Sequence, residues 1–473
     1  MRLLSYLKAW RSSGSLLSIG EEAGLSIDEV LQKVTGNTGH KIIYTSIIDK
    51  IMLIMRLYDG VFWLEVPSMI HRLEIENFYS IRETQVIDLR IGAKVPDEEG
   101  RFGQINDGSG ERVPKTVALF GANASGKSNV LKALAFLRWF LVDSFALPPD
   151  VGLPVLRFAD GNHDPSRLRV HFSWFSELES VDPEILSRTP FAQYIYEIKL
   201  SGDPDGRMTV LAEELRLQPA KGKSRKVFGR DERGEIESGS SFPLKGLHHV
   251  LAKLRSNVST TSTIAQFAEH TPTKVLLDWA RRITANIMIQ KTEYDEQAIF
   301  QYYASKPSMV GDLNRTLGRV DIGIRSMSFV STSSGPEPQF EHLGLNRPLL
   351  FLFESEGTRQ FFRVYPHIWE ALQRGGIALL DELDSTIHPM LLPEILRWFH
   401  DPKENPHNAQ LWMSGHSASL LEDLQKEEIF FTEKDQQGRT KIYGLKDIEG
   451  VRRVDNFYQK YLGGVYGAVP RIG

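Results

Sequence analysis

Residues 121–128 have types and a spacing that could hold the phosphates of a nucleotide. Their sequence, GANASGKS, matches the P-loop pattern G-x-x-x-x-G-K-[ST]. Glycines allow a tight turn whose backbone N–H groups point at phosphate oxygens. The lysine can reach the β- and γ-phosphates, and the final hydroxyl can ligate Mg²⁺. The alternative is a glycine-rich turn that matches the pattern by chance.

Each position of this pattern predicts a role. Lys127 is expected to bind the β- and γ-phosphates and to act in catalysis, and Ser128 to bind Mg²⁺. The expected cofactors are therefore ATP and Mg²⁺. The further nucleotide contacts are expected from Gly121, Asn123, Ala124, Ser125, Gly126 and Asn129.

A pair of carboxylates follows a second apolar run, residues 377–380. Four apolar residues indicate a buried strand, and ligands bind at the carboxyl ends of such strands in open α/β sheets. We expect Asp381 to hold Mg²⁺ and Glu382 to accept a proton from the attacking water or to orient it. A strand that ends in a polar turn is the alternative.

The elements needed to position these residues can be recognised. Residues 116–120 form a short apolar run before the P-loop, and residues 129–142 have helical character. The two motifs are about 250 residues apart, which is typical of ABC-type ATPases with insertions rather than of small GTPases or adenylate kinases. The expected fold is α/β: an ABC-type P-loop NTPase core with a mixed sheet, split by a largely helical insertion, with an N-terminal helical extension.

That order of motifs predicts an ABC signature at residues 354–359, ahead of a helix at 360–372. Ser355 and Gly357 at a helix N-terminus would donate a hydroxyl and N–H groups to a γ-phosphate of the opposite subunit. An ordinary helix cap is the alternative.

Two residues after the carboxylate pair complete the expected site. Asp384 is placed like a D-loop residue that crosses a dimer interface. His416 follows a strand predicted at 410–414 and is expected to contact the γ-phosphate, whereas His388 is interpreted as structural. No Q-loop glutamine is found at 141–175, and Gln193 is a poor substitute.

Composition excludes several classes of protein. The chain has 473 residues, a formal charge of -4 and no cysteine, so disulfides and thiolate metal sites are excluded. No apolar run is long enough to span a bilayer, and no signal peptide is recognised. We therefore expect a cytoplasmic protein.

The expected domains are an N-terminal extension (1–68), an ATPase N-lobe (69–180), an insertion or partner domain (181–345) and an ATPase C-lobe (346–473). Residues 17–34 faintly suggest helix-turn-helix. Residues 70–75 with 84–89, and 211–217 with 227–228, predict two hairpins. Strands are also expected at 167–174 and 194–200, and helices over 245–320.

From residue 69 onward, the chain resembles the RloA/PtuA/AriA-like bacterial "AAA family ATPases" of phage-defence and abortive-infection operons, which are ABC-type and related to the SMC and RecF families. The resemblance rests on MIHRLEIENFY (69–79), GANASGKSNVLKA (121–133), SEGTR (355–359), LDELDSTIHP (380–389) and the tail YLGGVYGAVP (461–470). Residues 414–417 depart from the family, which often has Thr-Thr before the histidine. The resemblance implies dimers or larger rings with composite ATP sites, and control of a separately encoded toxin or nuclease.

Other functions remain open. A RecF- or SMC-like DNA-repair ATPase is the main alternative, although the only basic cluster, at 221–226, is most simply a solvated hairpin tip. A nuclease of the OLD type is not expected, because only 57 residues follow His416. A transporter ATPase is disfavoured by the long insertion and the missing glutamine.

Overall fold

The computed structural model describes residues 68–473 apart from short gaps at 98, 106–109, 176–190, 204–205, 219–221, 241, 288–294, 321–322, 386, 388–390 and 470–473. The chain divides into two compact units, Met1–Leu64 and Glu65–Gly473. The expected helical extension, with the helix-turn-helix hypothesis at 17–34, lies outside the described residues except for Ser68, and His388 lies outside them too. All that follows concerns the second unit.

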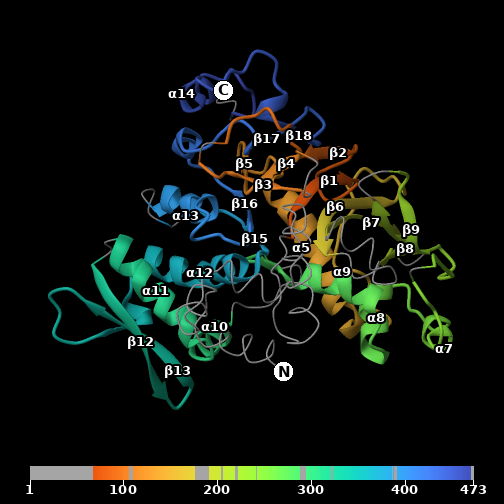
Figure 1. Ribbon diagram of the computed structural model, residues 1–473, viewed down its shortest axis with the longest axis horizontal. Coiled ribbons are helices and arrows are strands. Elements are labelled where there is room, and N and C mark those ends of the chain that lie inside the picture. The colour runs from red at the N-terminus through yellow and green to blue at the C-terminus, as the bar shows by residue number, and fades with distance from the viewer. Residues whose placement is uncertain are drawn as a thin grey trace, which may run out of the picture. The chain divides into compact units, whose positions relative to one another are not determined.

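A six-stranded sheet carries the motifs (Figure 1). Its order is β11-β15-β16-β5-β17-β18, with β18 antiparallel to β17 and every other neighbouring pair parallel. The mixed α/β fold and the strands predicted at 116–120, 377–380 and 410–414 are confirmed. The strands are β5 (Thr116–Phe120), β11 (Ile283–Ala285), β15 (Ile377–Leu380), β16 (Gln410–Ser414), β17 (Ile429–Lys434) and β18 (Thr440–Gly444).

Alternate residues of β5 face two different hydrophobic cores. Val117 and Leu119 pack in the core that contains the helix after the P-loop, whereas Ala118 and Phe120 pack in the core on the opposite face. Side chains of a strand point alternately to its two faces, so both faces of this sheet are covered. That explains why β5 is a continuous apolar run with every residue buried.

A second, antiparallel sheet has the order β10-β9-β8-β7-β6-β1-β2. The hairpins predicted near 70–89 and 211–228 are confirmed as the pairs β1–β2 and β8–β9. β6 pairs with β7 along its length, so one sheet contains strands from both sides of the boundary expected between residues 180 and 181. The domain limits themselves stay a prediction. The strands are β1 (Ile70–Glu76), β2 (Gln85–Asp88), β6 (Ser166–Phe175), β7 (Phe191–Gly202), β8 (Met208–Gln218), β9 (Arg225–Arg230) and β10 (Ile236–Ser238).

Helix α5 (Lys127–Asp143) lies between the two sheets and shares one core with both. Ten of its residues are buried, which fixes the helix that starts at the P-loop. Its neighbours are α8 (Thr260–Phe267) and α9 (Thr271–Arg281), and α7 (His248–Leu251) precedes them. Smaller elements are β3 (Phe102–Gln104), β4 (Arg112–Pro114), α13 (Leu391–His400) and α14 (Phe457–Leu462).

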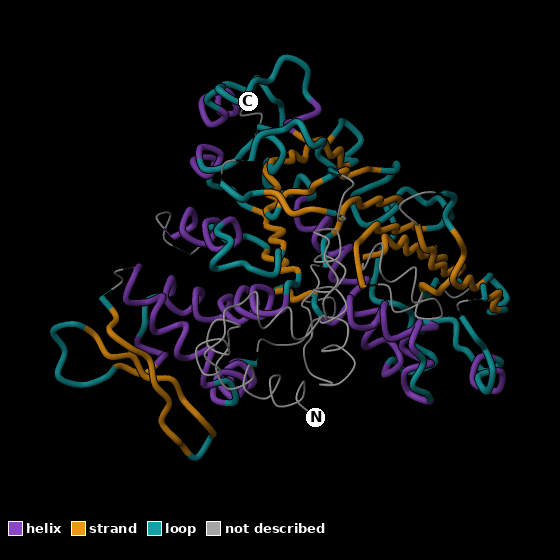
Figure 2. Tube along the Cα trace, in the orientation of Figure 1, coloured by secondary structure: helices purple, strands orange, loops and turns teal. Residues whose placement is uncertain are grey.

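The chain between β11 and β15 forms a helical group with its own small sheet (Figures 1 and 2). β12 and β13 form a hairpin that contacts α11 and α10, and β14 pairs with β13. The elements are α10 (Glu296–Ala304), α11 (Pro307–Val320), β12 (Ile324–Thr332), β13 (Gly335–His342), β14 (Leu349–Leu350) and α12 (Glu356–Arg374).

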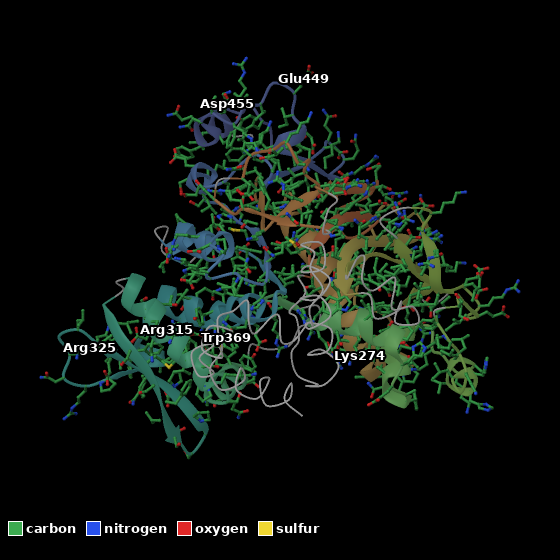
Figure 3. All side chains as sticks on the ribbon, in the orientation of Figure 1. Lys274, Arg315, Arg325, Trp369, Glu449 and Asp455 are labelled. Atoms are coloured by element: carbon green, nitrogen blue, oxygen red, sulfur yellow. The ribbon has the colours of Figure 1, made fainter. Side chains whose placement is uncertain are left out.

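Side chains join α11 to α12. Figure 3 labels Arg315 and Trp369, which lie close together on these helices. Both contact Asp312: the indole N–H of Trp369 donates to one of its carboxylate oxygens at 2.7 Å, and Arg315 pairs with the other. The contacts tie the middle of α12 to its neighbour.

Proline 366 lies inside α12 and has no N–H to donate to the carbonyl of Phe362. The hydroxyl of Tyr303 in α10 donates to that carbonyl at 2.9 Å, and both residues are fully buried. The tyrosine therefore satisfies a backbone acceptor that the proline leaves unpaired, and it also stacks on the Phe362 ring. None of the described helices is both long and apolar enough to cross a membrane.

We predict that Tyr303→Phe lowers the free energy of unfolding by about 1–2 kcal/mol, because a buried carbonyl loses its donor. The measurement is urea denaturation of the full chain. Pro366→Ala is the control background: it restores an N–H to the helix, so Tyr303→Phe should there cost less by about 1 kcal/mol. Equal costs in both backgrounds would contradict this account of α12.

Candidate nucleotide-binding site

The P-loop connects the buried end of β5 to the first turn of α5. Its two glycines have positive φ, 149° at Gly121 and 112° at Gly126. A Cβ at Gly121 would overlap the carbonyl oxygen of Thr432, and one at Gly126 would overlap the hydroxyl of Thr440. Close packing against β17 and β18 therefore requires glycine at both positions. Asn123 and Ala124 stand exposed at the crest of the loop.

The ammonium of Lys127 is held by the loop itself. Its Nζ donates to the carbonyl oxygens of Gly121 at 2.9 Å and Ala122 at 3.1 Å, and the side chain is almost fully buried. Burial lowers the pKa of Lys127, an effect opposed by the nearby charges of Asp381, Glu382 and Asp384. Among the described residues Lys127 makes no ion pair, so a buried cation faces neutral oxygens.

A chain of hydroxyl and carboxylate groups links α5 to β15 and β16. The hydroxyls of Ser128 and Ser414 both donate to Oδ1 of Asp381, at 3.0 and 2.5 Å. Ser414 in turn accepts the backbone N–H of Glu382 at 2.9 Å. The structure thus brings the two residues predicted to hold Mg²⁺, Ser128 and Asp381, into direct contact.

Asn286 was not predicted from the sequence, yet it holds Asp381 at two points. Its Oδ1 accepts the backbone N–H of Asp381 at 2.8 Å, and its Nδ2 donates to the Asp381 carbonyl at 3.1 Å. The residue directly follows β11, which pairs with β15. Only this strand pairing brings Asn286 to the site, so no local sequence signal could have revealed it.

Glu382 and His416 lie side by side next to Lys127. His416 Nε2 is 3.8 Å from Glu382 Oε1, and its Nδ1 is 3.4 Å from Lys127 Nζ. The Glu382 side chain is 58% exposed, so water can reach its carboxylate. Glu382 has φ of 50°, in the left-handed region that costs a residue with a side chain some strain.

The carboxylate of Asp384 accepts hydrogen bonds from backbone groups of its own chain. Its Oδ2 accepts the backbone N–H groups of His416, at 2.6 Å, and Ser417. A Cβ at Gly415 would stand 2.9 Å from the same oxygen. The contact gives a physical reason for glycine in place of threonine at 415, because glycine leaves room for the Asp384 carboxylate.

Ser355 and Gly357 begin α12, away from the P-loop. The Ser355 hydroxyl accepts the N–H of Thr358 at 3.1 Å and caps the helix, while the residue itself stays exposed. Within the described part of the chain, no hydrogen bond joins either residue to residues 121–128. The ordinary helix cap, the alternative to an ABC signature, is therefore present. The role of Ser355 and Gly357 as an ABC signature stays a prediction.

A second line of polar contacts, also not predicted, supports the P-loop from outside. Asn129 donates to the Ser80 hydroxyl at 2.7 Å, Ser80 and Thr440 hydroxyls are 2.7 Å apart, and Thr440 donates to the Ser125 carbonyl at 2.8 Å. The C-terminal tail, recognised only by resemblance, also contacts the loop, because Ala122 N–H donates to the Ala468 carbonyl at 3.2 Å.

Two other sequence features lie elsewhere. Gln193 is in the middle of the antiparallel sheet, opposite Ser173 and Gln218. In the basic cluster at 221–226, Lys226 pairs with Glu237 at 2.6 Å, and Lys221 is outside the described residues.

The family model "AAA domain, putative AbiEii toxin, Type IV TA system" matches residues 117–422. None of the curated proteins matches the chain.

Three solved structures illustrate the likeness in structure, each at 14% identity. An SMC head domain from Thermotoga maritima aligns over 79% of this chain and 98% of its own, with a TM-score of 0.36. An SmcHead bound to the C-winged helix domain of ScpA aligns over 79% and 97%, with a TM-score of 0.41. An Smc head with an extended coiled coil, bound to the C-terminal domain of ScpA derived from Pyrococcus furiosus, aligns over 80% and 96%, with a TM-score of 0.40.

We predict that Asn286→Ala raises the Mg²⁺ concentration needed for half-maximal nucleotide binding by about 10-fold, because residues that orient a metal ligand contribute about this much. Titration of Mg²⁺ against a fluorescent ATP analogue measures it. Asn314→Ala is a matched control, since Asn314 makes the same two-point contact with the backbone of Met327. Equal Mg²⁺ dependence of nucleotide binding in both variants would contradict the role given to Asn286.

Proposed function

Since the chain belongs to the AAA-domain family whose model matches residues 117–422, we propose that it is a Mg²⁺-dependent ATP hydrolase of the ABC type whose nucleotide state controls a separately encoded effector. The effector would be a nuclease or toxin of a bacterial antiviral system, and the ATP site would close between two copies of the chain. The observation that carries the hydrolase activity is the joining of Lys127, Ser128, Asp381 and Glu382 at one edge of the sheet.

The residues at this edge fit a magnesium nucleotide. The first turn of α5 carries no acidic residue, so no nearby carboxylate in that turn opposes phosphate at the positive end of the helix. Lys127 can exchange its neutral carbonyl partners for phosphate oxygens. Ser128 and Asp381 offer the hard oxygen ligands that Mg²⁺ prefers. Bound Mg²⁺ would neutralise part of the phosphate charge.

Hydrolysis would then use the carboxylate of Glu382. Water attacks the γ-phosphorus, its proton passes to the Glu382 carboxylate, and the bond to the β–γ bridging oxygen breaks to leave ADP and phosphate. Lys127 stabilises charge on the phosphates. His416, between Glu382 and Lys127, is placed to contact the γ-phosphate and to respond when it leaves.

Closure between two copies is supported by the surface around Ser355. The helix N-terminus there is exposed, and two large apolar side chains beside it, Leu352 and Phe353, are 70% and 69% exposed. Adjacent exposed apolar residues favour an interaction surface. A second copy placing its Ser355 and Gly357 against the first copy's γ-phosphate would cover them. Asp384, close to His416, would lie at the same interface.

Control of an effector is supported by the family description, which names a toxin and a type IV toxin–antitoxin system, and by the resemblance to phage-defence ATPases. The alternative, a DNA-repair ATPase, needs a nucleic-acid surface. The basic cluster gives it little support, because Lys226 already pairs with Glu237. The steady-state ATPase rate with and without duplex DNA distinguishes the effector switch from the DNA-repair ATPase. A rate unchanged by DNA supports the effector switch, and strong stimulation of the rate by DNA overturns it.

Two variants should separate ATP binding from hydrolysis. Lys127→Ala should weaken ATP binding by about 30-fold or more, since it removes charged hydrogen bonds to phosphate. Glu382→Gln should bind ATP like the wild type but hydrolyse it at least about 100-fold more slowly. Isothermal titration and phosphate release measure the two effects. A Glu382→Gln chain with wild-type turnover would show that another group is the base.

Ser355→Asp tests closure between copies. Aspartate caps a helix as well as serine does, so the fold and the melting temperature should hold, while its charge repels a γ-phosphate. In the Glu382→Gln background, sedimentation should show ATP-dependent dimers that Ser355→Asp abolishes and that Ser355→Thr retains. ATP-dependent dimers unaffected by Ser355→Asp would place the interface elsewhere.

A further inference from the structure

A cavity of about 700 Å³ lies between α5, the helix after the P-loop, and α12, apart from the proposed ATP site. Its walls come from the second half of α5, from α9 and β11, from α10 and from the second half of α12. The volume is within the range of sites for small organic ligands. No residue of the P-loop and neither residue of the 381–382 carboxylate pair lines it, so neither the binding nor the hydrolysis of ATP uses this space.

Among the described side chains that line the cavity, cations outnumber carboxylates. Five cationic side chains face the cavity, and among the described lining residues Glu370 is the only carboxylate. Four of these cations also form ion pairs. Arg138, Arg281 and Arg363 pair with carboxylates outside the lining, and Arg374 pairs with Glu370. The cationic residues are Arg138, Arg281, Lys306, Arg363 and Arg374.

The two remaining titratable groups add little negative charge. Burial raises the pKa of Glu370, although Arg374 opposes the shift, and its carboxyl accepts the hydroxyl of Tyr302. Burial, followed by the charge of Arg138, lowers the pKa of His367 to about 4, so the imidazole is neutral near pH 7. Among the described residues Lys306 makes no ion pair, and its Nζ stands 5.9 Å from the centre of the Tyr302 ring.

Flat and apolar surfaces complete the lining. Trp139 of α5 and Tyr302 of α10 are partly buried, and Ile283 of β11 and Ile299 of α10 also line the cavity. Aromatic faces stack on planar rings, and arginine forks bind phosphate. We propose that this cavity binds a small anion bearing a planar ring, of the nucleotide class, at a second site separate from ATP.

The walls connect the second site to the first. Arg138 lies about 16 Å along α5 from Lys127, at a rise of 1.5 Å per residue. α12 begins after the Ser355 cap, and β11 is followed directly by Asn286, which holds Asp381. A ligand that contacts α5, β11 and α12 together therefore touches three of the elements on which the proposed ATP site depends. Its binding would favour one relative placement of these elements and so alter ATP turnover.

The test is binding to the full-length Lys127→Ala chain, in which nucleotide binding at the P-loop should be weakened by about 30-fold or more. Variants of the cavity lining then assign the remaining binding to the cavity. Isothermal titration measures the binding of five probes: AMP, 3′,5′-cyclic AMP, a cyclic dinucleotide, adenosine and inorganic phosphate. We expect saturable binding of at least one nucleotide with Kd below about 1 mM. Lys306→Glu and Arg138→Glu should each weaken it by about 10-fold or more. Arg325→Glu is the control, since Arg325 is an exposed cation on β12 outside the cavity lining (Figure 3).

Each other outcome overturns the proposal. Adenosine binding as tightly as the nucleotides would exclude an anion site, and phosphate alone binding as tightly would exclude recognition of a ring. Absence of saturable binding, or binding weakened equally by Arg325→Glu, would exclude the cavity. Because Arg138→Glu could disturb folding, Trp139→Leu and the melting temperature accompany it. The readout is binding rather than turnover, so it stands apart from the proposal for ATP hydrolysis.

Discussion

Asp381 joins four parts of the fold at one point. Its carboxylate accepts hydroxyls from the first turn of α5 and from the end of β16, while its backbone is held by Asn286 at the end of β11. Three parallel strands and the P-loop helix are therefore connected through one residue. A shift of any of them would move the carboxylate that we assign to Mg²⁺, and so the account of the site depends on this junction.

The position of Asp381 is fixed because the strands and the helix around it are buried. β5, β15 and β16 are buried along their whole lengths, and α5 is covered by the antiparallel sheet on one side and the parallel sheet on the other. In contrast, the groups assigned to catalysis and to the partner copy, Glu382, His416 and Ser355, are exposed. A rigid base with exposed reacting groups suits a site that a second molecule completes.

The sequence allowed prediction of what is local and left out what depends on distant pairing. The P-loop, the strands at 116–120, 377–380 and 410–414 and the two hairpins could be predicted because spacing and apolar runs encode them. Asn286, Ser80, Thr440 and Ala468 could not, because strand order and the path of the tail bring them to the site. The roles assigned to the site residues, and the domain limits, remain predictions.

The most direct test of a site shared between two copies is complementation. A Lys127→Ala chain keeps its Ser355 end, and a Ser355→Asp chain keeps its P-loop, so each alone should hydrolyse little ATP. A mixed head-to-tail dimer would contain one site with both halves intact. The account predicts that mixing the two inactive chains restores ATP hydrolysis to a clear fraction of the wild-type rate. A mixture as inactive as its separate components would contradict it.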